Sequence, residues 1–557
     1  MALTDALIRL QDELSPLELG LDLPGAPEAR RVRGELVAQI DDYLLPRLRE
    51  MDAPLLMVVG GSTGAGKSTI VNSLVGSVVS PAGVLRPTTR APVLVCHPDD
   101  LSWFESDRVL PGLSRASGST AAPGGLRLAP TDALPAGLAL LDSPDIDSVV
   151  AENRALANQL LAAADSWLFV TTAARYADAV PWDLLHAARD RGTALCVVLN
   201  RVPPEATEEV SAHLGQMLGE RRLAGTELLV VPETDLDLGL IPRAALEPVR
   251  QWLGGLAADA NARGLLVRRT LTGALDSLPV RVGVVGRAVA EQGAAADELR
   301  ADVRAAYTQG LAEVDEAVKS GSLLRGEVLA RWHDVVGTGE ILRALETRIG
   351  WLRDRVRALI TGAPTAHAEL QTAVQTSIDA VVHAAADRAA ERAASSWGQR
   401  PAGRSLLSAA KRLDAASPQL VEATRDEVRA WQGFVFELVR REGAEKRTTA
   451  RLASLGVNGA GLTVMLAVFL QTGGLTGAEV VVAGGTSALS QKVLEAIFGD
   501  QAVRALAARA REDLVARVER LLETDAERFY GLIAPIAPPP ESGSRLREAL
   551  LGVERAR

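Results

Sequence analysis

A glycine-rich segment of eight residues restricts the fold of this chain more than any other feature. Residues 61–68 read GSTGAGKS, which has the form G-x-x-x-x-G-K-S. The apolar run 55–59 precedes the segment and predicts a buried strand, and residues 69–74 predict the start of a helix. A strand, this loop and a helix in that order are the setting of a phosphate-binding loop. The alternative is a glycine-rich turn that only joins a strand to a helix.

The residue types of this segment suit the chemistry of phosphate binding. Glycines let the backbone approach a phosphate chain closely, and the N–H groups of the loop and of the helix N-terminus donate hydrogen bonds to it. We expect Lys67 to reach the β- and γ-phosphates and the Ser68 hydroxyl to bind Mg²⁺. The nucleotide-binding residues predicted here are Gly61, Ser62, Thr63, Gly64, Ala65, Gly66, Lys67, Ser68 and Thr69.

Length and charge limit the classes of protein to consider. At 557 residues, the chain is long enough for about three or four domains. Its net charge is −10 and it has no long basic run, so we expect no nucleic-acid partner. Cys96 and Cys196 lie in separate apolar runs, which predicts buried thiols in a reducing compartment. The N-terminal residues lack the pattern of a signal peptide, so we expect a cytoplasmic protein.

Residues 51–257 alternate apolar runs with helical or loop segments, which predicts an α/β domain with a mostly parallel sheet. Ligands bind at the carboxyl ends of the strands in such folds, and the polar residues of interest follow those ends. We expect strands at 55–59, 93–96, 138–141, 167–170, 194–199 and 228–231.

Two further motifs suit a magnesium site. Asp142 ends an apolar strand, so its carboxylate is expected near the phosphates, where it can hold Mg²⁺ through water. The alternative is an aspartate that caps a turn. One of Thr88 and Thr89 is expected to complete the magnesium shell and to sense the γ-phosphate, and the sequence does not choose between them. The alternative there is a surface loop.

Two loops at strand ends carry weaker signals. Asn200 and Arg201 follow the strand 194–199, and a side-chain amide there suits contact with a nucleobase. Arg175 follows the strand 167–170, where it is either a solvated loop residue or a cation that approaches phosphate, within one chain or across a dimer.

The remaining chain predicts an elongated α-helical bundle, because apolar residues recur at spacings of three and four from residue 258 onward. The predicted organisation is an N-terminal helical segment that packs with the bundle (1–50), the nucleotide domain (51–257), the bundle or stalk (258–451), an apolar hairpin (452–500), a return helix (501–536) and a flexible tail (537–557).

The hairpin is unusual because no charged residue occurs between Arg451 and Glu479. Its more apolar part, 457–470, is shorter than the ~20 residues that a helix needs to span a bilayer. A helical hairpin that enters one leaflet fits this pattern, and so does a hairpin buried in a soluble core.

The motifs at 61–68, at Thr88 and Thr89, at 142–144 and at 200–201 occur in the order found in the Ras-like GTPase superfamily. Within it, the chain resembles a bacterial dynamin-like protein. The resemblance implies a P-loop GTPase domain with long flanking helices, GTP as substrate and Mg²⁺ as cofactor. It further implies a homo- or hetero-oligomer formed through the nucleotide domain, and peripheral membrane association with lipid contact through 452–500.

Several residues depart from the family pattern. Pro203 stands where the guanine-reading aspartate is expected, and proline cannot accept two N–H bonds, so ATP is an alternative substrate. Glu233, after the next strand, is a hypothetical substitute for that carboxylate. Thr63 replaces the catalytic glutamine of dynamins, and Asp145 replaces the glycine three residues after the switch aspartate. We therefore expect slow basal turnover with help from a partner chain.

The sequence thus predicts Mg²⁺-dependent nucleoside triphosphate hydrolysis, with GTP preferred and the nucleotide state passed to the helices. The predicted catalytic residues are Lys67, Ser68, Thr88, Thr89 and Asp142, of which all but Lys67 are predicted metal ligands. One alternative is a nucleotide-gated scaffold that scarcely hydrolyses. The other is a soluble P-loop nucleoside triphosphatase with a buried hairpin.

Overall fold

The chain folds into two compact units. The sheet unit contains Met1–Leu19, Gly25–Glu291 and Pro538–Arg557, and the bundle unit contains Gly20–Pro24 and Gln292–Ala537. The computed structural model describes residues 2–81, 91–106, 110, 113–117, 125–145, 151–190, 193–223, 225–320, 364–410, 412–445, 464, 465, 468 and 500–557.

The sheet unit is built on an eight-stranded sheet in the order β3-β4-β2-β5-β1-β6-β7-β8. All neighbouring pairs are parallel except β2 and β5, which are antiparallel. The mostly parallel sheet expected for 51–257 is therefore confirmed. The strands are β1 (Leu55–Gly61), β2 (Val93–Cys96), β3 (Arg115–Ser117), β4 (Leu126–Pro130), β5 (Leu138–Asp142), β6 (Ser166–Thr172), β7 (Ala194–Val202) and β8 (Glu227–Pro232).

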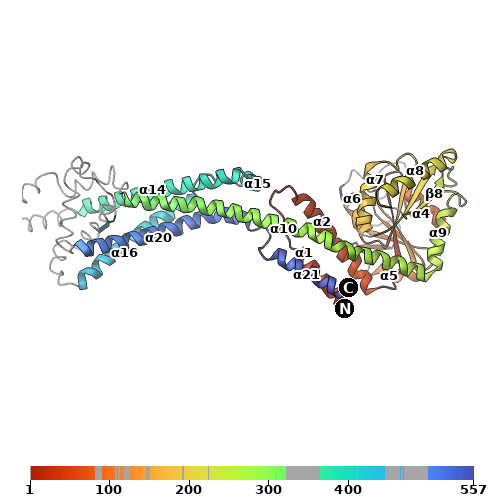
Figure 1. The fold of residues 1–557 in the computed structure, drawn as a ribbon, viewed down its shortest axis with the longest axis horizontal. Helices are drawn as coiled ribbons and strands as arrows, with labels where there is room; N and C mark the ends of the chain where they lie inside the picture. The colour runs from red at the N-terminus through yellow and green to blue at the C-terminus, as the bar shows by residue number, and fades with distance from the viewer. Residues whose placement is uncertain are drawn as a thin grey trace, which may run out of the picture. The chain divides into compact units, whose positions relative to one another are not determined.

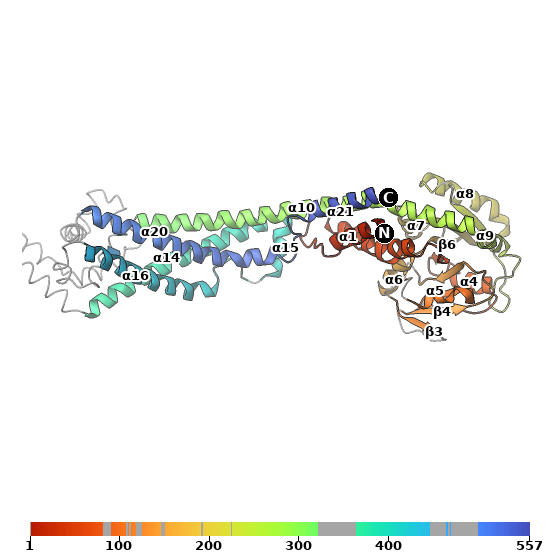
Figure 2. The same ribbon diagram turned by 90° about the horizontal axis from the view of Figure 1, so that it is seen from below.

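Helices cover both faces of this sheet (Figure 1, Figure 2). The helical elements of the sheet unit are α1 (Ala2–Leu14), α2 (Ala26–Gln39), the π-helix η1 (Ile40–Leu44), α3 (Leu45–Arg49), α4 (Lys67–Val75), η2 (Pro98–Asp100), α5 (Leu101–Glu105), α6 (Ala151–Ala162), α7 (Ala179–Asp190), η3 (Pro204–Ala206), α8 (Thr207–Glu220), α9 (Glu247–Ala258), the first half of α10 (Ala260–Lys319) and α21 (Ser542–Ala556).

The central strand β1 shows how the two faces are filled. Its side chains alternate, as in any strand: Leu56 and Val58 join a core with residues of α5, α6, α7 and α8. Met57 and Val59 join the other core, with residues of α4, α9 and the start of α10. Because both faces are buried, β1 is apolar throughout. This burial fixes β1, and with it the start of the loop that follows.

The chain ends in a helix, which corrects one expectation. The sequence predicts a flexible tail over 537–557, but Ser542–Ala556 forms α21. Leu546 and Val553 of this helix are buried in an apolar cluster with residues of α1, α2, η1, α3 and α10. They lie seven residues apart, on one face of the helix. The three prolines at 538–540 suggested a linker and hid this helical spacing in the sequence.

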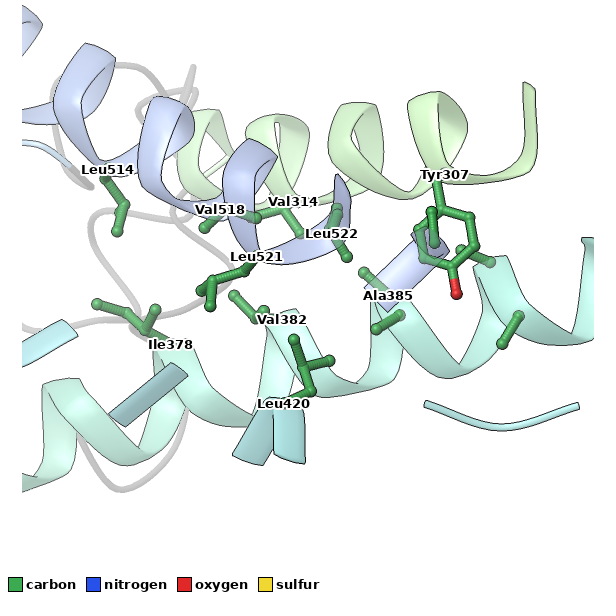
Figure 3. Packing of buried hydrophobic residues seen from close by; sticks show 14 of the residues in the cluster. Tyr307, Val314, Ile378, Val382, Ala385, Leu420, Leu514, Val518, Leu521 and Leu522 are labelled. Carbon is green, nitrogen blue, oxygen red and sulfur yellow. The ribbon is translucent and has the colours of Figure 1, made fainter. Parts of the chain in front are cut away.

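The bundle unit consists of the second half of α10, with α14 (Pro364–Gly398), α15 (Pro401–Ala409), α16 (Pro418–Glu445) and α20 (Asp500–Ile533). The long helices lie side by side, as Figure 1 shows. Figure 3 shows Tyr307 and Val314 of α10 packed with residues of α14 and α20. Small residues let α10 and α14 approach each other closely. A Cβ on Gly310 of α10 would lie only 3.2 Å from the Cβ of Ala389 on α14.

Buried polar groups fix the register of the bundle helices. The indole of Trp397 donates to Leu299 O at 3.0 Å, and the Tyr307 hydroxyl donates to Asp525 Oδ2 at 2.6 Å. The division between the units falls within α10, between Glu291 and Gln292, and not near residue 258 as expected. The helix is continuous across this division, so its helical periodicity has no break there that would mark the division in the sequence.

Most of the predicted hairpin, 452–500, lies outside the described residues. Of its described residues, Val464, Met465 and Val468 are buried in the core of the bundle unit, and Asp500 begins α20. None of the described helices has both the length and the continuous hydropathy needed to cross a bilayer.

Candidate functional site

The loop 61–68 joins β1 to the N-terminus of α4 at the carboxyl edge of the sheet. Gly61 has φ of 146°, and a Cβ on it would lie 2.1 Å from Val170 O on β6. Gly66, at the N-cap of α4, has φ of 97°. Both positions need glycine, since other residues rarely adopt these angles and a side chain at Gly61 would collide with β6.

The ammonium group of Lys67 is held within the loop. Lys67 is buried, with 5% of its surface exposed. Its Nζ donates to Gly61 O at 2.9 Å and to Ser62 O at 3.2 Å. It also donates to Asp145 Oδ1 at 2.5 Å. An ammonium has three protons, so these three acceptors account for all of them.

The carboxylate of Asp142 lies beside the first turn of α4. Strand pairing places Asp142 at the end of β5, opposite Val59 of β1. Its fully buried Oδ2 accepts hydrogen bonds from Ser68 Oγ at 2.6 Å and Ser80 Oγ at 2.5 Å. Burial raises the pKa of Asp142, and these two hydrogen bonds and the charge of Lys67 only partly oppose that rise.

Ser80 reaches Asp142 because Asn72 of α4 holds the chain beyond the helix. The amide oxygen of Asn72 accepts the N–H groups of Val79 and Ser80 at 2.9 and 2.8 Å, and its Nδ2 donates to Ser80 O at 2.8 Å. Sequence reasoning missed both Asn72 and Ser80. A long-range contact between single polar residues has no motif, so no sequence signal would have identified it.

These residues fit a magnesium ion. The Oδ1 atom of Asp142 is buried and has no hydrogen-bond partner among the described residues. It belongs to the carboxylate that Ser68 Oγ contacts, and carboxylate and hydroxyl oxygens suit a hard divalent cation. Within the described part of the chain, no group of three or more His, Cys, Asp or Glu residues is placed to hold a metal. Oxygens of phosphate and water would also coordinate such an ion.

Asn200 braces the phosphate loop from β7. Its Nδ2 donates to Ala65 O at 2.8 Å, and its Oδ1 accepts the N–H of Arg201 at 2.9 Å. A Cβ on Gly66 would lie 2.6 Å from this Nδ2, so Gly66 must lack a side chain for a second reason. Arg201 is exposed and has φ of 54°. The expected nucleobase contact of these two residues stays a prediction.

Arg175 lies next to the phosphate loop. Its Nη1 donates to Thr63 O at 2.9 Å, and its Nε pairs with Asp178 Oδ2 at 2.8 Å. The side chain of Arg175 is 41% exposed, so both alternatives, a solvated loop residue and a cation that approaches phosphate, stay open. By contrast, Thr88 and Thr89 lie outside the described residues.

Together, the sheet order, the glycine loop and the buried lysine at its helix define an α/β domain of the P-loop type, here joined to a helical bundle. No protein-family model matches the chain. No curated protein matches it either.

Among solved structures, the chain is similar to a member of an oligomerised bacterial dynamin pair described as sensing and tethering membranes, with 9% identity over 99% of this chain and 95% of that one, at a TM-score of 0.36. It is also similar to the LeoA bacterial dynamin GTPase from ETEC, with 15% identity over 96% and 98% of the two chains, at 0.24. Both matches to bacterial dynamins, the family that the sequence resembles, extend along nearly the whole of each chain.

A third similar structure is Era in complex with MgGDPNP and a segment of 16S ribosomal RNA. The identity is 18% over 36% of this chain, and the match spans 56% of Era, about half its length, at a TM-score of 0.25. Because all three TM-scores are below 0.5, the class assigned here rests on the sheet order and the loop geometry, and not on the superpositions.

Proposed function

We propose that this protein binds and hydrolyses a nucleoside triphosphate with Mg²⁺, and that GTP is its preferred substrate. The observation that carries the proposal is the 2.6 Å hydrogen bond between Ser68 Oγ and Asp142 Oδ2. It joins the last residue of a phosphate-loop motif to a buried carboxylate on the neighbouring strand. A glycine-rich turn that only connects a strand to a helix has no need of this carboxylate.

Each residue of the site has a proposed role. The N–H groups of 61–68 and the N-terminus of α4 donate to the phosphates, and Lys67 neutralises their charge. Ser68 and Asp142 hold Mg²⁺, with one of Thr88 and Thr89 as a further ligand. When bound, the ion would neutralise charge on the terminal phosphates.

Catalysis by such a site depends on positive charge near the transferred phosphate. Lys67 and Arg175 supply two cations that both contact backbone carbonyls of the loop. Thr63 cannot orient a water molecule as a glutamine amide would, so we propose slow basal turnover. A partner chain, bound through the sheet unit, would raise the rate.

The preference for GTP rests on the loops after β7 and β8. The N–H of Glu233 donates to Val202 O at 2.9 Å, which ties the second loop to the first. The exposed side chain of Glu233 thus follows β8 close to the segment that carries Pro203. A carboxylate there can accept hydrogen bonds from the N–H groups of guanine. The side chain of Pro203 has no acceptor for them.

A chain of hydrogen bonds links β1, at whose end the loop begins, to α10 within the sheet unit. The hydroxyl of Thr270, on α10, donates to Asp165 O at 2.8 Å and accepts the N–H of Ala194 at 3.1 Å. The carboxylate of Asp165 accepts the N–H of Leu56 at the start of β1. We propose that α10 responds to the loop through β1. We further propose that the apolar hairpin 452–500, apart from its buried residues Val464, Met465 and Val468, contacts lipid.

Phosphate release by the purified chain tests this function. We expect slow release from GTP in the presence of Mg²⁺, and loss of that release in Lys67→Ala. Lys319→Ala is a matched control, because Lys319 is partly exposed and pairs with Asp315 on its own helix. Turnover that survives Lys67→Ala would contradict the proposal.

The second candidate is a nucleotide-gated scaffold with little hydrolysis. The pairing of Lys67 with Asp145 favours it, because a lysine held by a carboxylate is less available to a transferring phosphate. Tight binding of GTP without Lys67-dependent phosphate release would support the scaffold and exclude the hydrolase.

A further inference from the structure

The phosphate-loop lysine already has an acidic partner. Two of the three acceptors around Lys67 Nζ are carbonyls of its own loop, those of Gly61 and Ser62. The third, Asp145 Oδ1 at 2.5 Å, is the only one of these three acceptors that carries charge and the only one that comes from another segment. Asp145 is also the more exposed partner, at 18% against 5% for Lys67. Of the three contacts, this one is the most open to exchange.

Asp145 is held near Lys67 by the strand end that precedes it. The Oγ of Ser143 donates to Val59 O at 2.9 Å, and the N–H of Ser143 bonds the same carbonyl at 3.3 Å. Ser143 is thereby fixed to β1, and only Pro144 separates it from Asp145. The acidic residue is therefore directed at the lysine by a short, anchored segment.

We propose that Asp145 is a specificity-determining residue that occupies the place of the terminal phosphate on Lys67. This inference rests on the proposed function. A nucleoside triphosphate has to displace the carboxylate, because its terminal phosphate needs the same ammonium group and carries charge of the same sign. A diphosphate shares Lys67 with Asp145. The residue thus opposes triphosphate binding selectively, and its return to Lys67 accompanies loss of the terminal phosphate.

The test compares Asp145→Asn with the unaltered full chain. Asparagine keeps the shape of the side chain and removes its charge. Affinities for GDP and for a non-hydrolysable GTP analogue, both with Mg²⁺, are measured by titration. A partly exposed charge-assisted pair predicts about tenfold tighter binding of the analogue, which is about 1.4 kcal/mol. The affinity for GDP should change less than about threefold.

Two variants control for charge and for side-chain length. Asp132→Asn removes the same charge from an exposed position of the sheet unit and should leave both affinities unchanged. Asp145→Glu restores the carboxylate and should bind the analogue close to the level of the unaltered chain.

Thermal unfolding shows whether the variant still folds. Without nucleotide, Asp145→Asn should unfold at a lower temperature than the unaltered chain, because the buried Lys67 loses its counter-charge. The rise in unfolding temperature that the analogue causes should be larger than for the unaltered chain. A variant with a damaged fold would show a smaller rise.

Weaker or unchanged binding of the analogue by Asp145→Asn would overturn the inference, and so would equal tightening for GDP and the analogue. If the unaltered chain binds both nucleotides and Asp145→Asn behaves like it, only this inference fails. If neither the unaltered chain nor any variant binds a nucleotide, the proposed function itself fails.

Discussion

Two ion pairs of the sheet unit, Lys67–Asp145 and Arg47–Asp165, each join a basic side chain to an aspartate but differ in how firmly the aspartate is held. Arg47 contacts both carboxylate oxygens of Asp165 and also donates to Ala53 O and Pro54 O. Asp165 is 1% exposed, whereas Asp145 is 18% exposed. Asp165 also accepts the N–H of Leu56.

The difference shows where the domain is rigid and where it can change. The pair at Asp165 ties α3 to the start of β1 and the start of β6, on the edge of the sheet opposite the phosphate loop. The pair at Lys67 has a single contact and lies where a phosphate would bind. We infer that the first pair is a permanent part of the framework and that the second changes its partner during function.

The largest expected effect comes from breaking the rigid pair. Asp165→Asn leaves the buried Arg47 without a counter-charge, which should lower the free energy of unfolding by about 3–5 kcal/mol. Chemical denaturation of the full chain measures the loss, with Asp132→Asn as the exposed control. A loss below about 1 kcal/mol would show that the pair at Asp165 is no firmer than an exposed one.

Asp42, on η1, extends the comparison to a buried carboxyl group. No cation is among the main causes that shift its pKa. Burial, and to a lesser extent the nearby Asp41, raises the pKa of Asp42 from 3.8 to about 6, although a hydrogen bond with Gln159 opposes the rise. The neutral form therefore stabilises the fold below pH 4, and this stabilisation is lost as the pH rises through 6.

Asp42→Asn should consequently stabilise the protein at pH 7 by about 2–3 kcal/mol, and the gain should disappear near pH 4. Thermal unfolding from pH 4 to pH 7 measures this. Asp41→Asn removes the same charge from an exposed neighbour and should have a small effect. A gain that does not vary with pH would contradict the assigned cause.

Arg175 tests whether the edge that carries the phosphate loop uses a second cation. Arg175→Ala should lower the rate of phosphate release about tenfold, or about 1.4 kcal/mol, with a smaller change in nucleotide affinity. Arg269→Ala, on the exposed side of α10, is the control. An unchanged rate would mean that the contact with Thr63 O only braces the loop.

The smallest expected effect concerns the choice of base. If the carboxylate of Glu233 reads guanine, Glu233→Gln should reduce the preference for GTP over ATP about fivefold, or about 1 kcal/mol. Competition between the two nucleotides measures this preference, with Glu208→Gln on α8 as the control. A preference that is unchanged, or absent in the unaltered chain, would exclude this role for Glu233.

Much of the framework was predictable because its signals are local. A strand buried on both faces is an apolar run, so β1, β5 and β6 were expected close to their observed positions. The short strands β3 and β4 were not expected. Arg115–Ser117 is too brief for a pattern, and Leu126–Pro130 is a five-residue segment that ends in proline.

The site was predictable where it follows a spacing and not where it depends on folding. Asp142 was expected near the phosphates because it ends a strand, and the structure brings it to Ser68. The contacts of Ser80 with Asp142 and of Arg175 with Thr63 join residues 62 and 112 positions apart. Asp145 was visible only as a departure from a family pattern, and its partner Lys67 emerged from the fold.

Calorimetric titration of the folded, full-length chain with a non-hydrolysable GTP analogue and Mg²⁺ tests the central claim most directly. We predict saturable binding at one site per chain, and affinity at least about tenfold weaker in Lys67→Ala. Absence of binding to any nucleoside triphosphate by the unaltered chain, or equal affinity in Lys67→Ala, would contradict the assignment of residues 61–68 as a phosphate-binding loop.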